Sequence, residues 1–125
     1  MATIPVTEAT FGDTIKDNGI VFVDFWAAWC GPCRMFGPVF ESVSEVYPDA
    51  VFAKVDTDAE QALAGGLGIS SIPTLMAFRD GYLVYREAGA LNKSQFTSLV
   101  EQVQALDMEK LKAEAEAETE AAKAN

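Results

Sequence analysis

The chain of 125 residues is half apolar, which suits a single globular domain with its own core. Nine basic against nineteen acidic residues give a net charge of -10, which repels nucleic acid and anionic membranes rather than recruiting them. The sequence contains no histidine, so Ser-His and Cys-His catalysis and imidazole-bound zinc are excluded.

The N-terminal segment MATIPVTEATFG lacks the basic cluster and apolar block of an export signal, and the sequence has no apolar run long enough to span a bilayer. We therefore expect a cytoplasmic protein that binds neither membranes nor nucleic acid. The sequence requires nothing larger than a monomer.

The first predicted element is a short helix. Thr7 is a suitable N-cap for it, and Val6 can pack on Phe11 as a hydrophobic staple. The helix should end near Asn18.

Residues 20–26, IVFVDFW, form an almost unbroken β-branched and aromatic run, which is typical of a strand covered on both faces. We expect this strand at the centre of a sheet.

A second helix is predicted from Cys33 to Tyr47, because apolar residues recur there at helical spacing. Pro38 lies inside this helix and should bend it. The cysteine pair therefore falls at a strand-to-helix junction. The apolar positions are Met35, Phe36, Val39, Phe40, Val43 and Val46.

A second strand is predicted at residues 51–55, followed by a helix that starts at Thr57 and is closed by the glycines of AGGLG. Residues 74–78 and 82–86 are apolar runs that flank the turn sequence RDG. This pattern predicts an antiparallel hairpin.

The next helix is predicted to begin after Asn92, whose side chain can cap it while Gln95 reaches back. Its apolar stripe comprises Phe96, Leu99, Val100 and Val103. The order of elements indicates an α/β fold for a domain of residues 1–106. Residues 107–125 are rich in Ala and Glu, which predicts an acidic tail that is either a frayed helix or disordered.

The two cysteines of the chain, Cys30 and Cys33, stand in FWAAWCGPCR, and three roles compete for them. A structural disulfide closing so short a loop would stabilise the fold by only about 2 kcal/mol, and the cytosol keeps ordinary thiols reduced. A four-cysteine metal site would need two chains to share it. The third role, a dithiol that is reversibly oxidised, is favoured.

The position of the pair supports this redox role. A helix N-terminus favours the thiolate form of Cys30, and an exposed thiolate is the species that attacks a disulfide. Cys33, one turn further on, can then attack the mixed disulfide and leave the two cysteines joined. Gly31 allows close approach of a substrate, and Pro32 fits the start of a helix.

The surrounding sequence extends the argument to a family resemblance. VDFWAAWCGPCR, the helix proline Pro38, KVDTD at 54–58, GISSIPTL at 68–75 and GAL at 89–91 resemble segments of thioredoxins and occur in the same order. The resemblance spans residues 3–106 and leaves out the tail. It implies a thioredoxin fold, in which a central mixed β-sheet is flanked by α-helices on both faces. It also implies dithiol-disulfide exchange with protein substrates.

The resemblance assigns chemical roles to four residues. Cys30 would be the attacking nucleophile and Cys33 the buried resolving thiol. Asp24 would transfer a proton to or from Cys33, and burial should raise its pKa; a solvent-facing strand residue is the alternative. Lys54 would lie near Asp24 and modulate it, although an ordinary surface lysine also fits the sequence.

The resemblance also implies a substrate-binding surface. Pro73 would be a cis-proline that exposes the backbone of Ile72 to an incoming substrate strand. The flat apolar surface around it would comprise Trp29, Gly31, Pro32, Ile72, Gly89 and Ala90.

CGPC resembles the motif of reducing members of the family, which implies a disulfide reductase without a bound cofactor or metal. Its electrons would come from NADPH through a flavin-containing thioredoxin reductase, and its other partners would be proteins that carry disulfides. Two alternatives stay open. One is a disulfide oxidant or isomerase on the same fold, and the other is a non-catalytic binding subunit that uses the surface around Trp29 and Pro73.

Overall fold

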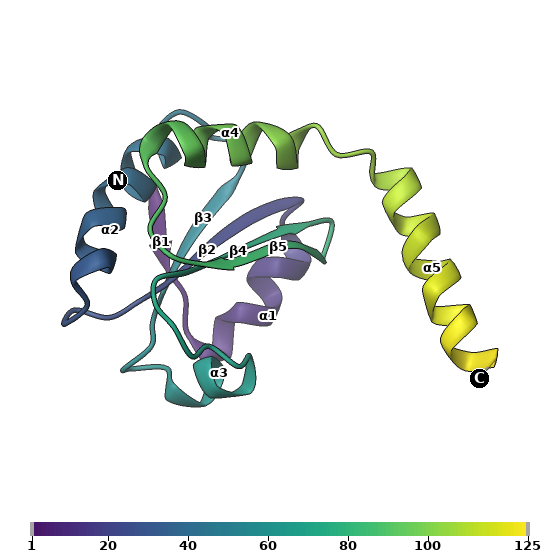
Figure 1. Cartoon of the computed structure of the whole chain (residues 1–125), viewed down its shortest axis with the longest axis horizontal. Coiled ribbons are helices and arrows are strands. Elements are labelled where there is room, and N and C mark those ends of the chain that lie inside the picture. The colour runs from purple at the N-terminus through teal and green to yellow at the C-terminus, as the bar shows by residue number, and fades with distance from the viewer. Residues whose placement is uncertain (1, 125) are drawn as a thin grey trace.

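The computed structural model describes residues 2–124, and within them five strands form one mixed sheet in the order β1-β3-β2-β4-β5 (Figure 1). Strands β1, β3 and β2 run parallel, whereas β4 is antiparallel to both of its neighbours. The strands are β1 (Thr3–Pro5), β2 (Ile20–Trp26), β3 (Val51–Asp56), β4 (Thr74–Arg79) and β5 (Tyr82–Ala88). The helices are α1 (Glu8–Asp17), α2 (Gly31–Ser44), α3 (Gln61–Gly66), α4 (Lys93–Gln104) and α5 (Met108–Ala124).

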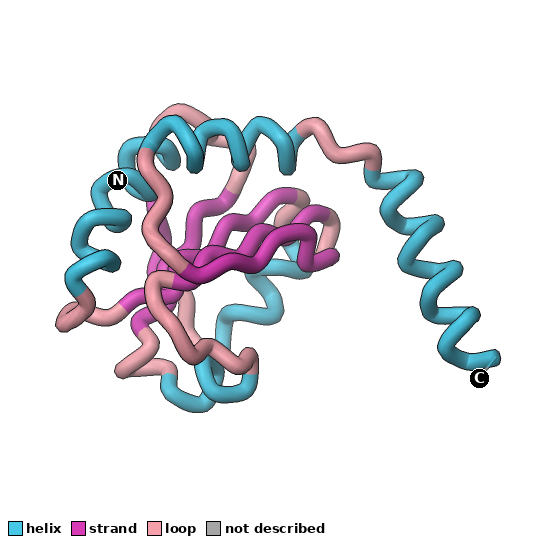
Figure 2. Tube along the Cα trace, viewed as in Figure 1, coloured by secondary structure: helices cyan, strands magenta, loops and turns pink. Residues whose placement is uncertain are grey.

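Helices cover both faces of the sheet, with α1 and α3 on one face and α2 and α4 on the other (Figures 1 and 2). Side chains alternate along β2, so Val23 and Phe25 pack with α1 and α3, while Phe22 packs with α2 and α4. Residues 21–25 of β2 are all buried, as expected of a central strand. The predicted fold class is confirmed.

Five phenylalanine rings fill the space between the sheet and the helices α2 and α4. Phe96 of α4 contacts the other four rings, with centroid distances of 5.4 to 6.0 Å. Such buried aromatic pairs are stabilising beyond the area they remove from water. The cluster fixes α2 on the sheet, and it therefore fixes the α2 N-terminus, where the cysteines lie. The other four rings are Phe22, Phe36, Phe40 and Phe52.

Turns and caps follow the predictions closely. Thr7 is the N-cap of α1, and the hairpin turns at Asp80 and Gly81, whose φ angles of 52° and 85° are those a type I′ turn requires. At the start of α4, the side chain of Asn92 accepts the N–H of Gln95 at 2.8 Å, and the Gln95 side chain accepts the N–H of Asn92 at 3.0 Å. The predicted capping box is confirmed.

Strand β1 and helix α3 differ from prediction. Strand β1 was not expected, because three residues that include Pro5 carry no alternating pattern; the strand is defined by its pairing with β3. Helix α3 starts at Gln61 rather than Thr57, because the Asp56 carboxylate accepts the N–H groups of Asp58 and Ala59 and holds the intervening residues in a turn.

Helix α2 also begins and ends earlier than predicted. Its buried side includes Phe36, Phe40 and Val43, whereas Met35 is 73% exposed and Val46 is 62% exposed. Met35 neighbours the apolar stripe without belonging to it, and Val46 lies beyond the helix end.

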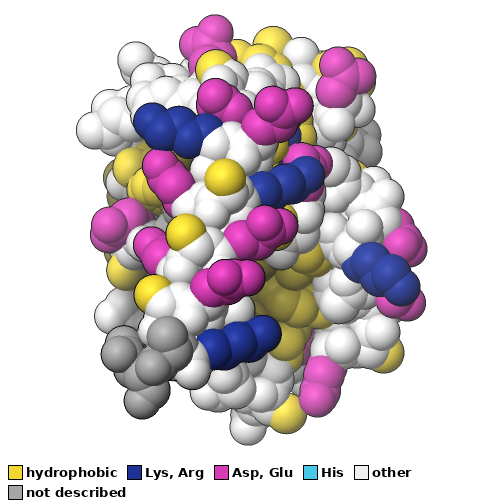
Figure 3. All heavy atoms as spheres, turned by 90° about the vertical axis from the view of Figure 1, so that its right-hand side faces the viewer, with side chains coloured by type: hydrophobic (Ala, Val, Ile, Leu, Met, Phe, Trp, Pro, Cys, Tyr) yellow, Lys and Arg dark blue, Asp and Glu magenta, His cyan; other side chains and the backbone are white. Residues whose placement is uncertain are grey.

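Helix α5 leaves the body of the molecule after α4 (Figure 1). Its first turns contact the domain through the partly buried Met108, Leu111 and Ala115, and Lys112 forms an ion pair with Asp80 at 3.2 Å. Charged side chains, mostly acidic, cover the outward face of α5 (Figure 3). Among the helices of residues 2–124, none combines the length and apolar character needed to cross a bilayer.

Candidate active site

The two cysteines lie where β2 gives way to α2. Cys30 is the N-cap of α2 and Cys33 is in its first turn, and the two are joined by a disulfide with Cα atoms 5.2 Å apart. The Cys30 sulfur accepts the backbone N–H of Cys33 at 3.2 Å, as a capping side chain does. The same N–H and the helix dipole stabilise negative charge on Cys30 once the disulfide is opened.

Both cysteines are 4% exposed, so Cys30 is less accessible than the exposed thiolate expected from the sequence. Ala27 is buried with the pair, and Trp26 and Ile72 pack against it. Trp29, by contrast, is 67% exposed. Neighbouring residues therefore cover most of Cys30, while the adjacent Trp29 side chain lies open to solvent.

The segment before β4 passes directly beside Cys30. The Ile72 carbonyl oxygen lies 3.6 Å from the Cys30 sulfur, and the peptide bond from Ile72 to Pro73 is cis. The carbonyl of Pro73 accepts the N–H of Gly89 at 2.8 Å. This bond places the turn that contains Gly89 and Ala90 next to Pro73.

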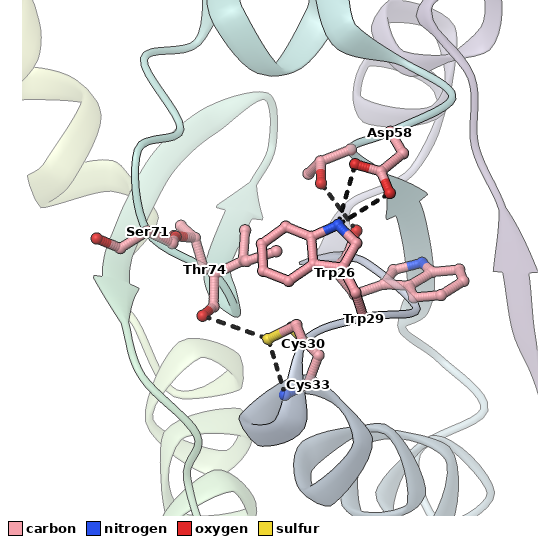
Figure 4. Close-up of a disulfide and its surroundings, with 9 residues drawn as sticks. Trp26, Trp29, Cys30, Cys33, Asp58, Ser71 and Thr74 are labelled. Carbon is pink, nitrogen blue, oxygen red and sulfur yellow. Dashed lines mark hydrogen bonds between the residues drawn. A yellow bond between two sulfur atoms is a disulfide. The ribbon is translucent and has the colours of Figure 1, made fainter.

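Trp29 is held in place by a contact that the sequence did not reveal. Its indole N–H donates to the Asp58 carboxylate, at 3.0 Å to Oδ2 and 3.3 Å to Oδ1. Figure 4 shows this pair on one side of the cysteines, with Ser71 and Thr74 on the other. No spacing in the sequence relates residues 29 and 58, because the contact depends on the parallel pairing of β2 with β3.

Asp24 is completely buried on β2, which excludes a solvent-facing position. Neither of its carboxylate oxygens has a hydrogen-bond partner within residues 2–124. Burial raises the pKa of Asp24 from 3.8 to about 7, an effect that the nearby Lys54 ammonium partly opposes. A carboxyl group with this pKa exchanges its proton near neutral pH.

Lys54 lies opposite Asp24 in the pairing of β2 with β3. Its ammonium is 5.1 Å from the ring centroid of Trp26, and it reaches across to Gly37 of α2, where an added Cβ would lie 3.7 Å from it. A pocket of about 480 Å³ is lined by both Lys54 and Cys33. Lys54 is therefore partly buried beside the site and is not an ordinary surface lysine.

Within residues 2–124, no three His, Cys, Asp or Glu side chains gather in a way that could hold a metal ion.

Comparison with known proteins agrees with this geometry. The thioredoxin family model matches residues 2–102. Thioredoxin 1 of Synechococcus elongatus is 45% identical over 98 residues, covering 77% of this chain and 92% of the relative. Thioredoxin of Mycobacterium tuberculosis is 46% identical over 95 residues, covering 74% and 82%. A Streptomyces coelicolor relative is 47% identical over 121 residues, covering 96% and 90%, so that alignment continues into α5.

Solved structures give the same result. A mutant thioredoxin from Halobacterium salinarum superposes with a TM-score of 0.77 at 38% identity, covering 83% of this chain and 92% of that one. Plasmodium falciparum thioredoxin superposes with a TM-score of 0.73 at 38% identity, covering 78% and 96%. With its two cysteines joined at the head of α2 beside a cis-proline, this chain is a protein-disulfide reductase and belongs to the thioredoxin family.

Proposed function

We propose that Cys30 is the nucleophile and Cys33 the resolving thiol of this reductase. The observation that carries the assignment is the position of Cys30 at the N-cap of α2, where its sulfur accepts the Cys33 N–H. In the reduced protein, the Cys30 thiolate attacks a substrate disulfide, which forms a mixed disulfide and releases one substrate thiolate. The Cys33 thiolate then attacks the Cys30 sulfur, so the second substrate thiolate leaves and two electrons have passed to the substrate.

Asp24 is proposed to accept the proton that Cys33 must lose before it attacks. Its pKa of about 7 suits proton exchange at neutral pH, and the carboxyl group is completely buried. Lys54 is proposed to adjust this pKa through its charge. The pocket lined by Lys54 and Cys33 offers protons a way between this region and solvent.

Substrates are proposed to bind over the surface formed by Trp29, Gly31, Pro32, Ile72, Gly89 and Ala90. An extended substrate strand would pair with the exposed backbone around Ile72, which lies beside the Cys30 sulfur. Backbone pairing of this kind tolerates many sequences, as a general disulfide reductase requires.

We further propose that the protein works as a monomer in the cytoplasm and is itself reduced by a flavin-containing thioredoxin reductase that draws on NADPH. The support is the family membership and the reducing CGPC motif. The domain boundary after residue 106, with α5 as an addition to it, is likewise a proposal; it is supported by the family match ending at residue 102.

Replacing Cys33 with serine tests the assignment of the two thiols. The Cys33→Ser protein should attack substrate disulfides through Cys30 and then stop, because the group that resolves the mixed disulfide is gone. Incubation with insulin followed by non-reducing mass spectrometry should show a covalent adduct at Cys30. The Cys30→Ser protein, treated in the same way, is the matched control and should form none. An adduct at Cys33 in that control would reverse the two roles.

The reduction potential of the pair tests the direction of electron flow. We expect a value of about -270 mV, which is characteristic of thioredoxins. Trp26 and Trp29 lie close to the disulfide, so their fluorescence can follow a titration against a dithiothreitol couple. A potential of about -120 to -180 mV would instead identify an oxidant or isomerase.

A further inference from the structure

Residues 68–73, which we call the substrate loop, are irregular backbone between α3 and β4. This loop carries the Ile72 carbonyl, 3.6 Å from the Cys30 sulfur. The distance matters because the reacting sulfur of a substrate must reach Cys30 while its backbone lies against Ile72. Whatever fixes the loop therefore also fixes the geometry of attack.

Three carbonyl groups of the substrate loop accept hydrogen bonds from β4, β5 and the turn after β5. Thr74 Oγ1 donates to Ser71, and the Gly89 N–H donates to Pro73 at 2.8 Å. The third donor is the Arg86 guanidinium, whose Nη2 lies 3.0 Å from the Gly68 carbonyl oxygen. Arg86 thus fixes the start of the loop, and the other two donors fix its end.

On the α3 side, the start of the loop depends on the last turn of a short helix. Helix α3 has six residues and ends in Gly65-Gly66, which favours unfolding of its last turn. Gly68 follows with φ of 69°, a conformation that lets the chain turn sharply. The Gly68 N–H donates to the Gly65 carbonyl at 3.0 Å and the Ile69 N–H donates to the Ala64 carbonyl at 2.9 Å, so these bonds tie the start of the loop to this short helix. The Arg86 side chain ties the same point to the sheet.

Arg86 is placed to anchor the loop to the sheet. It pairs with Met76 across the hairpin, on the face of the sheet where Met76 packs with Ile69 and Ile72. Between the loop and β5 lies a pocket of about 220 Å³, lined by Gly68, Ser70, Ser71, Thr74, Arg86, Glu87 and Ala88. The Arg86 guanidinium reaches the Gly68 carbonyl across this gap.

We propose that Arg86 is a positioning residue for protein substrates: its hydrogen bond to Gly68 holds the substrate loop so that the Ile72 backbone and the Cys30 sulfur engage a substrate strand together. The inference rests on the proposed docking of substrates at Ile72. It assigns Arg86 no contact with the reacting sulfurs. Replacing Arg86 should therefore weaken the reduction of substrates that have a peptide backbone and leave the reduction of other disulfides unchanged.

The test uses the full-length protein in its reduced form and the variant Arg86→Met, which keeps the aliphatic length of the side chain and removes its donors. Oxidation is followed by tryptophan fluorescence with two probes, insulin and 2-hydroxyethyl disulfide, which has no peptide backbone. For insulin, the half-saturating concentration should rise roughly threefold to tenfold, as expected from the loss of one solvent-exposed hydrogen bond, with little change in the maximal rate. For 2-hydroxyethyl disulfide, the rate should not change.

Three further variants sharpen the result. Arg86→Lys keeps a donor and should restore part of the insulin affinity. Gly68→Ala strains the acceptor side of the same hydrogen bond, because its φ of 69° disfavours a side chain, and should reproduce the selective defect. Lys16→Met removes one exposed positive charge on α1 and should behave as the wild type.

The proposal is wrong if Arg86→Met leaves insulin kinetics unchanged, or if it slows both probes equally, which would mean that it acts on the cysteines or the fold as a whole. Failure of the wild-type protein to reduce either probe is a separate outcome. It would overturn the proposed function, and this inference with it.

Discussion

Replacement of Cys30 by serine is expected to abolish disulfide reduction. A serine hydroxyl stays protonated at neutral pH and cannot replace the thiolate that the α2 N-terminus stabilises, so the rate should fall by roughly three orders of magnitude or more. The measurement is insulin reduction driven by dithiothreitol, corrected for the rate without protein. Circular dichroism and thermal unfolding should show that the fold is kept, because the two larger core clusters contain neither cysteine.

The same variant separates the reductase from a binding subunit that uses the surface around Trp29 and Pro73. A binding subunit would keep its effect on a partner after the change from Cys30 to serine. Reduction at close to the wild-type rate by Cys30→Ser would contradict the mechanism, since Cys33 would then have to start the reaction from its place inside α2.

Replacement of Asp24 by asparagine is expected to stabilise the protein at high pH by about 4 kcal/mol. The carboxyl pKa rises from 3.8 to about 7 on folding, so the folded state binds this proton more tightly than the unfolded state does. Stability from this group is therefore present below pH 4 and is lost as the pH rises toward 7. Asparagine is uncharged at every pH, so the free energy of unfolding of the variant should not fall over this pH range.

Urea unfolding at several pH values measures this effect directly. The difference between Asp24→Asn and wild type should be near its full size at pH 8, shrink between pH 7 and 4, and vanish below that range. Asp49→Asn, at an exposed position, is the matched control and should show little difference at any pH. A stabilisation that does not depend on pH would mean that the ionisation of Asp24 is not its cause. If Asp24 accepts the Cys33 proton, the Asp24→Asn protein should also resolve mixed disulfides more slowly than the wild type, in addition to being more stable at high pH.

Features set by neighbouring residues in the chain were predictable from the sequence. The Asn92 cap and the Asp80-Gly81 turn depend on contacts within a few residues, and the structure has both. The burial of Asp24 was predictable for a similar reason, because the run IVFVDFW leaves a central strand no exposed face. Position within a strongly apolar run is thus informative even for a charged residue.

Features set by contacts between distant segments were not predictable. Strand β1 exists through its pairing with β3, and Trp29 meets Asp58 because two parallel strands end side by side. The low exposure of Cys30 has the same origin, because Ile72, which packs against it, lies 42 residues further along the sequence. The family resemblance supplied the location of the site, whereas these packing details required coordinates.

Lys112 of helix α5 meets Asp80 at the tip of the β4-β5 hairpin. This tip lies on the opposite side of the molecule from the start of α2, which carries the cysteines (Figure 1). Arg79, beside the same tip, donates to the carbonyl groups of Val103 and Gln104 at the end of α4. A label or an immobilising support attached at the C-terminus would therefore pull on α4 and the hairpin tip rather than on the disulfide. Helix α5 can therefore serve as an attachment site that leaves the surface around Cys30 and Cys33 accessible to substrates.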